Sequence, residues 1–260
     1  MLKKRILTFL FAFPFLLLII LFLPNTLFSL FILIVTTLSL YELFTMIFSD
    51  RTKQIVSIAS GVLLCSVILF GNHHALLPIL SGLIIVLFLF YLLFHTNPKE
   101  GLHDLSLSLL GIAYLALLCP YLALIRNLSN GSTLFLLLLV IVWLTDTGAY
   151  FIGKKWGAHK LYEKISPGKT IEGAVGGLVF ALVGAYLYAS AFIDFINIPQ
   201  ILIIAFLVSC IGQVGDLCES MIKRSFRYKD SGKIIPGHGG ILDRIDALIF
   251  AAPLLYWFIS

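Results

Sequence analysis

Long apolar runs separated by short polar segments form the main pattern along this chain. Nine of these runs have about the length that a transmembrane helix needs, roughly 20 mostly apolar residues. We place them at residues 6–23, 27–48, 55–70, 75–94, 105–125, 132–152, 171–194, 199–221 and 241–258. The pattern predicts an all-α, polytopic integral membrane protein with about nine transmembrane helices.

The amino-acid composition agrees with a membrane protein and excludes several other classes. Of the 260 residues, 60% are hydrophobic and 12% are charged, whereas an average soluble domain is about 45–50% apolar and about 25% charged. A chain this apolar cannot cover a soluble surface, which excludes a secreted disulfide scaffold, a disordered chain and a cytosolic dinucleotide-binding enzyme. The four cysteines lie singly in apolar stretches and are expected to be core residues.

Loop charge predicts the orientation of the chain, because Lys and Arg accumulate on the cytoplasmic side of a membrane. With the N-terminus inside, 16 of the 18 Lys and Arg residues fall in the inner segments. The first run follows Lys3, Lys4 and Arg5 without a small-residue cleavage site after it, so we expect it to be a retained span. An odd number of spans then places the C-terminus outside.

The distribution of charge divides the chain into two regions. Residues 1–140 are rich in Leu, Ile and Phe, with Glu42 as the one charged residue inside a run, and we expect them to form a scaffold of transmembrane helices. Residues 141–260 contain two basic inner loops, at 153–170 and 222–240. We expect this second region to be the catalytic one.

Ionisable residues inside the apolar runs are functional candidates, because a charge in the bilayer is costly unless it is paired or hydrated. They are Asp146, Glu172, Asp216, Glu219, Asp243, Arg244 and Asp246. Asp243 and Asp246 are three residues apart, as are Asp216 and Glu219, so each pair lies on one helix face. Carboxylates that converge from several helices could hold a hard cation such as Mg²⁺. The alternative is a salt-bridge network neutralised by Arg244 or Lys223.

Each basic loop runs directly into a predicted helix. The first ends in Ser166-Pro167-Gly168-Lys169-Thr170 and the second in Pro236-Gly237-His238-Gly239-Gly240. Backbone N–H groups at a helix N-terminus favour an anionic phosphate group, and glycines let the backbone approach a ligand closely. Either loop alone could serve only as a topology determinant, and His238 could be an acid, a base or a structural residue. Two such loops beside one carboxylate cluster indicate phosphate chemistry at the inner membrane surface.

The loop after the eighth run resembles the signature of a known family. The stretches Ser220-Met221-Ile222-Lys223-Arg224, Lys229-Asp230-Ser231-Gly232 and IPGHGGILDRID at 235–246 resemble bacterial phosphatidate cytidylyltransferases, also called CDP-diacylglycerol synthases. The stretches TDTGAY at 145–150 and KISPGKTIEG at 164–173 are also similar to that family. Two departures, Ile171 in place of an expected aromatic residue and Cys218 at a variable position, remove no candidate ligand. The first 140 residues resemble the family only in hydropathy and general architecture.

The resemblance implies a reaction, a cofactor and a location. The reaction is transfer of CMP from CTP to phosphatidate, which gives CDP-diacylglycerol and pyrophosphate for membrane phospholipid synthesis. The cofactor is Mg²⁺, with a second, monovalent cation such as K⁺ as an option. The location is the bacterial cytoplasmic (inner) membrane, with the active site facing the cytoplasm. The expected partners are CTP, phosphatidate and membrane lipid, without nucleic acid, and a homodimer stays open.

The motifs also assign roles to individual residues. We expect Asp216, Asp243, Asp246 and Asp146 to ligate the metal, and Lys223 and Arg224 to act with these aspartates at the reacting phosphates. The residues expected to bind substrate are Ser166, Lys169, Thr170, Lys229, Asp230, His238, Gly239, Gly240 and Arg244. No general base is required, because a phosphate monoester is already ionised near neutral pH. Two alternatives stay open: a CTP-dependent enzyme acting on an isoprenoid lipid, and an ion-coupled secondary transporter.

Overall fold

The computed structural model describes residues 14–232 and 239–260, and most of these residues are helical. After a helical segment at 14–22, the helices are α2 (Asn25–Ile47), α3 (Arg51–Phe70), α4 (His73–Phe94), α5 (Pro98–Ala116), α6 (Pro120–Arg126), α7 (Gly131–Trp156), α8 (Ile171–Phe192), α9 (Ile198–Ser225) and α10 (Leu242–Ile259). An antiparallel hairpin of β1 (Lys160–Tyr162) and β2 (Ser166–Thr170) connects α7 to α8.

The predicted membrane character is confirmed for most of the chain. Seven helical segments among the described residues are long and apolar enough to cross a membrane: α2, α3, α4, α5 with α6, α7, α8 and α9. The 18 residues of α10 include three charged ones, Asp243, Arg244 and Asp246. Residues 6–13 of the first apolar run lie outside the described residues. The count of nine spans and the cytoplasmic N-terminus therefore stay predictions.

Three features differ from the sequence prediction. The run at 105–125 is interrupted between α5 and α6, where Pro120 opens the new helix; proline suits this first position because it lacks the N–H that would be unpaired there. The loop at 153–170 contains the β1–β2 hairpin, so the fold is not purely helical. Helix α9 continues to Ser225. Lys223 and Arg224 therefore lie on its last turn and not in a loop.

Polar side chains at the first turns explain where several helices begin. Asp50, Asn97, Thr170 and Asn197 each accept a hydrogen bond from a backbone N–H two or three residues further along the chain. Such caps satisfy N–H groups that have no partner within the helix. At Asp50, the hydrogen bond from the Thr52 N–H lowers the pKa of the carboxyl below its ordinary value. Thr170 sets the start of α8 at Ile171, as the sequence predicted.

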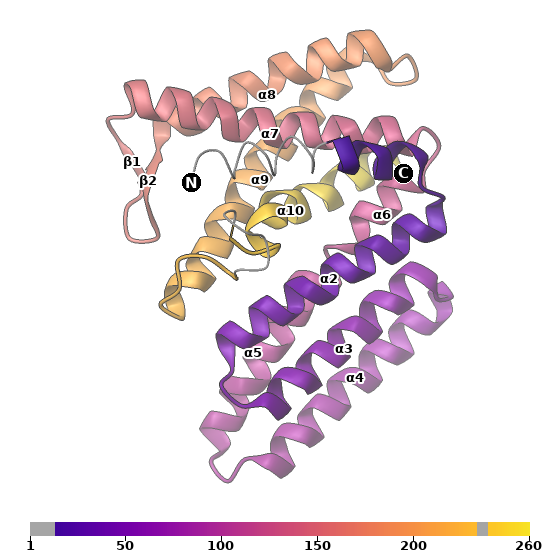
Figure 1. The fold of residues 1–260 in the computed structure, drawn as a ribbon, viewed down its shortest axis with the longest axis vertical. Helices are drawn as coiled ribbons and strands as arrows, with labels where there is room; N and C mark the ends of the chain where they lie inside the picture. Colours follow the sequence, from indigo (N-terminus) through magenta and orange to yellow (C-terminus); the bar gives the residue numbers. More distant parts are fainter. Residues whose placement is uncertain (1–13, 233–238) are drawn as a thin grey trace.

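The helices form two groups that meet at α6 and α10. In Figure 1, α2, α3, α4 and α5 lie together in one half of the molecule, while the long pair α7 and α8 lies across the other half with the hairpin at its end. Helix α9 packs against α8 and α10, and α10 also contacts α2, α6 and α7. Helix α6 also packs against α2, α3 and α7, so α6 and α10 together connect the N-terminal helices with the C-terminal region.

Small residues on α8 allow α7 to approach closely. A Cβ added at Gly177 would lie 2.5 Å from the backbone oxygen of Thr145, and one added at Gly176 would lie 2.5 Å from Cβ of Ile152. Real side chains do not tolerate such distances, so glycine is required at both positions. The segment from Gly173 to Gly177 thus packs against α7 of the same chain.

Candidate active site

Three acidic side chains converge where the second half of α9 meets the start of α10. One carboxylate oxygen from each of Asp216 and Glu219 on α9 and Asp246 on α10 lies within 4.8 Å of the other two. Glu219 is almost completely buried, with 1% of its surface exposed, and the other two are half-buried. The structure therefore brings together Asp216 and Asp246, as predicted, and adds Glu219 to them. We call these three residues the acidic cluster.

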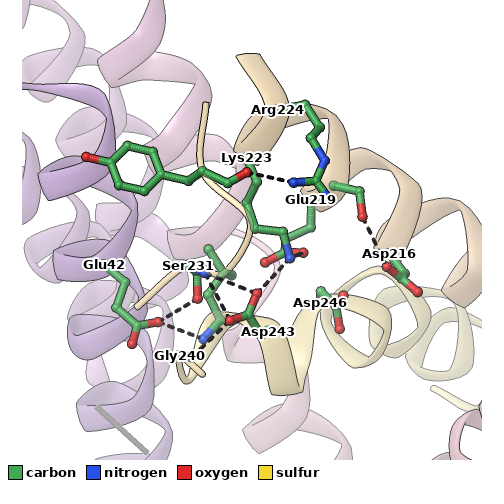
Figure 2. A network of polar contacts seen from close by, with 12 residues as sticks. Glu42, Asp216, Glu219, Lys223, Arg224, Ser231, Gly240, Asp243 and Asp246 are labelled. Atoms are coloured by element: carbon green, nitrogen blue, oxygen red, sulfur yellow. Dashed lines mark hydrogen bonds and ion pairs between the residues drawn. The ribbon is translucent and has the colours of Figure 1, made fainter. Parts of the chain in front are cut away.

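Lys223 connects the acidic cluster to Asp243. Its ammonium group forms one ion pair with Glu219, a turn earlier on α9, and a second with Asp243, at 2.6 Å from Oδ1. Figure 2 shows the ammonium between these two carboxylates. Because only 11% of the Lys223 side chain is exposed, both pairs lie in surroundings from which most water is excluded. The salt-bridge network that the sequence left open is thus present beside the acidic cluster.

Asp243 is occupied by protein donors and lies outside the acidic cluster. Besides the Lys223 ammonium, it accepts hydrogen bonds from the backbone N–H groups of Ser231, at 3.0 Å, and Gly240, at 2.9 Å. Gly239 has a φ of +83°, and a Cβ there would lie 2.8 Å from Oδ2 of Asp243. Glycine is therefore required beside this carboxylate. The arrangement differs from the expected ligand set, because both oxygens of Asp243 already have donors.

The acidic cluster has the donor chemistry of a divalent-cation site. It offers three carboxylates, which are the hard oxygen ligands that Mg²⁺ takes in proteins. Oε1 of Glu219 is buried and has no hydrogen-bond partner among the described residues. A buried oxygen without a donor is costly unless a cation or water satisfies it. The residues present therefore fit a divalent cation. In the sequence, the signal for Glu219 was its spacing of three residues from Asp216.

A cavity of about 470 Å³ lies beside the acidic cluster, between α7, α8, α9 and the hairpin. Asp146, Lys169, Thr170 and Asp216 all line it. The Lys169 ammonium lies 2.5 Å from Oδ2 of Asp216, so the hairpin is tied directly to the acidic cluster. The Thr170 hydroxyl accepts a hydrogen bond from the Gly173 N–H. Thr170 is therefore a helix cap as well as part of the cavity wall.

The other candidate residues lie on β2, at or after the end of α9, and at the start of α10. Ser166 begins β2, and Lys229 and Asp230 are exposed after α9. Arg224 is exposed and donates hydrogen bonds to the backbone oxygens of Ile165 and Tyr228. Arg244 is exposed on the first turn of α10, Gly240 is part of the Asp243 contact, and His238 lies outside the described residues.

Glu42 of α2 also reaches this site, which sequence reasoning did not predict. Its carboxylate accepts hydrogen bonds from the Ser231 hydroxyl at 3.0 Å, the Ile241 N–H at 3.1 Å and the Leu242 N–H at 3.0 Å. Its only signal in the sequence was its being the single charge within the apolar runs of the first 140 residues.

Comparison with known proteins agrees with this geometry. A sequence profile of the cytidylyltransferase family matches residues 3–260. The chain belongs to the cytidylyltransferase family. This membership confirms the resemblance that the motifs indicated, and it places the acidic cluster and its lysines in a family whose description refers to the transfer of cytidylyl groups.

Several relatives within the family carry a more specific name. The phosphatidate cytidylyltransferase of Staphylococcus saprophyticus is 48% identical over 153 residues, which are 58% of this chain and 58% of the relative. That of Bacillus subtilis is 46% identical over 154 residues, 58% of this chain and 56% of the relative. That of Staphylococcus aureus is 47% identical over 155 residues, 58% of each. The matched segment thus spans less than two thirds of the length of these relatives.

Proposed function

We propose that this chain transfers CMP from CTP to phosphatidate and releases CDP-diacylglycerol and pyrophosphate. The observation that carries the proposal is the acidic cluster with Lys169 on one side and Lys223 on the other. The cluster lies between α10 and α9, and α9 is long and apolar enough to cross a membrane. Relatives named phosphatidate cytidylyltransferase support the choice of acceptor.

The reaction is a displacement at the α-phosphorus of CTP. An oxygen of the phosphatidate phosphate forms a bond to that phosphorus, and the bond from the phosphorus to the oxygen that bridges to the β-phosphate breaks. Pyrophosphate leaves with the bonding electron pair. Because the attacking phosphate is already ionised near neutral pH, the protein does not need to remove a proton from it. Its contribution is to position the two phosphates and to compensate their charge.

Asp216, Glu219 and Asp246 would hold the divalent cation, for which we propose Mg²⁺. The chemistry that such a cation supplies is neutralisation of negative charge on the phosphate oxygens. Asp243 has a different role in this proposal from the one expected from its motif. It fixes the Lys223 ammonium through the 2.6 Å ion pair and thereby keeps that cation beside the acidic cluster.

The lysines and arginines provide the binding of two anionic substrates. Lys169 faces the cavity from β2, and Lys223 and Arg224 occupy the last turn of α9. Lys229 follows on the exposed segment beyond that helix. Cations at two separate positions suit a reaction that must hold a triphosphate and a lipid phosphate at the same time. The positive charge of the segments around the site supports a location at the cytoplasmic face of the bacterial inner membrane.

The test is incorporation of label from radioactive CTP into lipid by the purified, reconstituted protein. We expect labelled CDP-diacylglycerol and pyrophosphate to appear in a one-to-one ratio, only with phosphatidate and Mg²⁺ present. An isoprenyl phosphate and an isoprenoid alcohol serve as parallel acceptors. Label in those lipids and not with phosphatidate would contradict the proposed acceptor, and the absence of CTP binding would contradict the reaction class.

A further inference from the structure

Glu42 is buried in the helical half of the molecule that carries few other charges. It lies five residues before the end of α2, and 2% of its surface is exposed. Its two carboxylate oxygens accept three hydrogen bonds, and all three donors are 189 to 200 positions later in the sequence. A buried carboxylate is costly unless donors compensate it. Glu42 therefore depends on Ser231, Ile241 and Leu242 to compensate its buried charge.

Gly232 and Gly240 lie next to the donors of Glu42 and leave room for its carboxylate. A Cβ added at Gly240 would overlap the Glu42 carboxylate and the Ser231 hydroxyl, and one added at Gly232 would overlap the same carboxylate. A side chain at either position would displace the Glu42 carboxylate from the place where its donors hold it. The close contact is thus built into both partners.

The residues around Glu42 also donate hydrogen bonds to Asp243. Ser231 donates its hydroxyl to Glu42 and its backbone N–H to Asp243. On the other side, the Gly240 N–H binds Asp243 while the next N–H, that of Ile241, binds Glu42. Figure 2 shows Ser231 and Gly240 between the two carboxylates. Ser231 and the residues just before α10 are therefore bound both to Glu42 on α2 and to Asp243 on α10 itself.

We propose that Glu42 is a positioning residue for the reaction, acting through the first turn of α10. By accepting the N–H groups of Ile241 and Leu242, it fixes that turn, which carries Asp243 and Asp246. This extends the active-site machinery to α2, in the region that the sequence marked as a scaffold. The expected effect on catalysis rests on the proposed function. The contact between Glu42 and the start of α10 is independent of that function.

Glu42→Gln is the informative substitution, because it keeps the size of the side chain and replaces one acceptor by a donor. The new amide group faces a backbone N–H, so at least one hydrogen bond at the start of α10 is lost. We expect turnover to fall about 10–100-fold, the range found when a residue that orients ligating groups is removed. The KM values for CTP and phosphatidate should stay close to those of the wild type, since Glu42 contacts neither substrate in this account.

Hydrogen–deuterium exchange of the full-length protein in detergent provides a second readout. In Glu42→Gln, exchange should become faster in the segment from Gly239 to Asp246, while α3 and α4 keep their wild-type rates. Ser231→Ala removes only one of the three hydrogen bonds and should lower turnover less. Combined with Glu42→Gln it should lower turnover less than it does alone, because both changes weaken the same cluster of contacts around Glu42.

Asp104→Asn is the matched control, since Asp104 is also an acid of the N-terminal helices that is largely shielded from water, with 16% of its side chain exposed. It pairs with Lys53 at 2.5 Å and is remote in the chain from α10. An equal fall in turnover for Asp104→Asn and Glu42→Gln, or unchanged exchange at 239–246 in Glu42→Gln, would overturn the inference. If the wild-type protein makes no CDP-diacylglycerol, the proposed function fails. The exchange data then still decide whether Glu42 holds α10.

Discussion

The polar side chains of helices α2 to α5 and those of helices α7 to α10 differ in how they are paired. In the first group, several charges and hydroxyls pair with one another, although the buried Tyr114 hydroxyl has no hydrogen-bond partner among the described residues. Lys53 binds Asp104, and the hydroxyls of Ser57 and Tyr91 both meet that of Ser108. In the second group, three acids approach one another and Glu219 Oε1 has no hydrogen-bond donor among the described residues.

We interpret the paired polar groups as structural and the acidic cluster as a binding site for a cation. The paired groups in the N-terminal helices give a small net stabilisation to the fold. Acids that repel one another lower stability unless a cation binds, so their presence indicates a binding role. Glu42 is the exception in the first group, because its partners belong to the second. The following predictions test this distinction, from the largest expected effect to the smallest.

Asp246→Asn should have the largest effect on activity. The change removes one negative charge from the acidic cluster while keeping the shape of the side chain. We expect the rate of CDP-diacylglycerol formation to fall about 10²–10³-fold, the range for loss of one strong electrostatic contact in an active site. The initial rate with labelled CTP measures this. Near wild-type turnover would show that the acidic cluster does not take part in the reaction.

Lys223→Met should have the largest effect on stability. It leaves Glu219 and Asp243 without their shared cation in surroundings with little water. Removing one partner of a buried ion pair costs about 3–5 kcal/mol, measurable as a lower denaturation midpoint in detergent. The double variant Lys223→Met/Glu219→Gln should recover part of the loss, because one uncompensated charge is gone. Equal midpoints for the wild type and Lys223→Met would contradict the pairing.

Lys169→Gln should affect substrate binding more than folding. Its ammonium pairs with Asp216 and faces the cavity, so we expect the KM for one of the two substrates to rise about tenfold, as for loss of a hydrogen bond to a charged group. The substrate affected shows which anion this side of the site holds. Lys160→Gln is the control on the same hairpin, since that lysine binds the backbone oxygen of Pro167. Similar KM changes in both variants would contradict a specific role for Lys169.

Lys53→Met should have the smallest effect. It breaks the pair with Asp104, whose side chains are 21% and 16% exposed. Partly exposed ion pairs contribute about 0–1 kcal/mol. We expect a small shift of the denaturation midpoint and unchanged turnover. A large loss of turnover would remove the distinction between the two helix groups.

Features with a local cause could be predicted from the sequence, and long-range pairings could not. The start of α8 follows from Thr170 as a cap and the apolar residues after it. The extension of α9 to Ser225 was missed, because a hydropathy pattern ends where charged residues begin, although a helix continues through them. No local pattern connects Glu42 with Leu242, 200 positions later.

The acidic cluster was predicted in part for the same reason. Spacing of three residues placed Asp216 beside Glu219 and Asp243 beside Asp246, but it could not say which member of each pair faces the other helix. The structure selects Glu219 and Asp246 to join Asp216, and turns Asp243 towards Lys223 and the backbone of Ser231. The rotation of α10 about its axis decides this, and it depends on contacts with α2 and α9.

Binding of Mn²⁺ to the purified protein without substrate, followed by electron paramagnetic resonance, tests whether the acidic cluster holds a divalent cation. We expect a single Mn²⁺ site per chain that Mg²⁺ displaces. The affinity of this site for Mn²⁺ should fall at least about tenfold in Asp246→Asn. It should be unchanged in Asp194→Asn, because Asp194 is an exposed acid between α8 and α9. No bound Mn²⁺, or equal affinity in the wild type and Asp246→Asn, would contradict the assignment of the acidic cluster as the cation site.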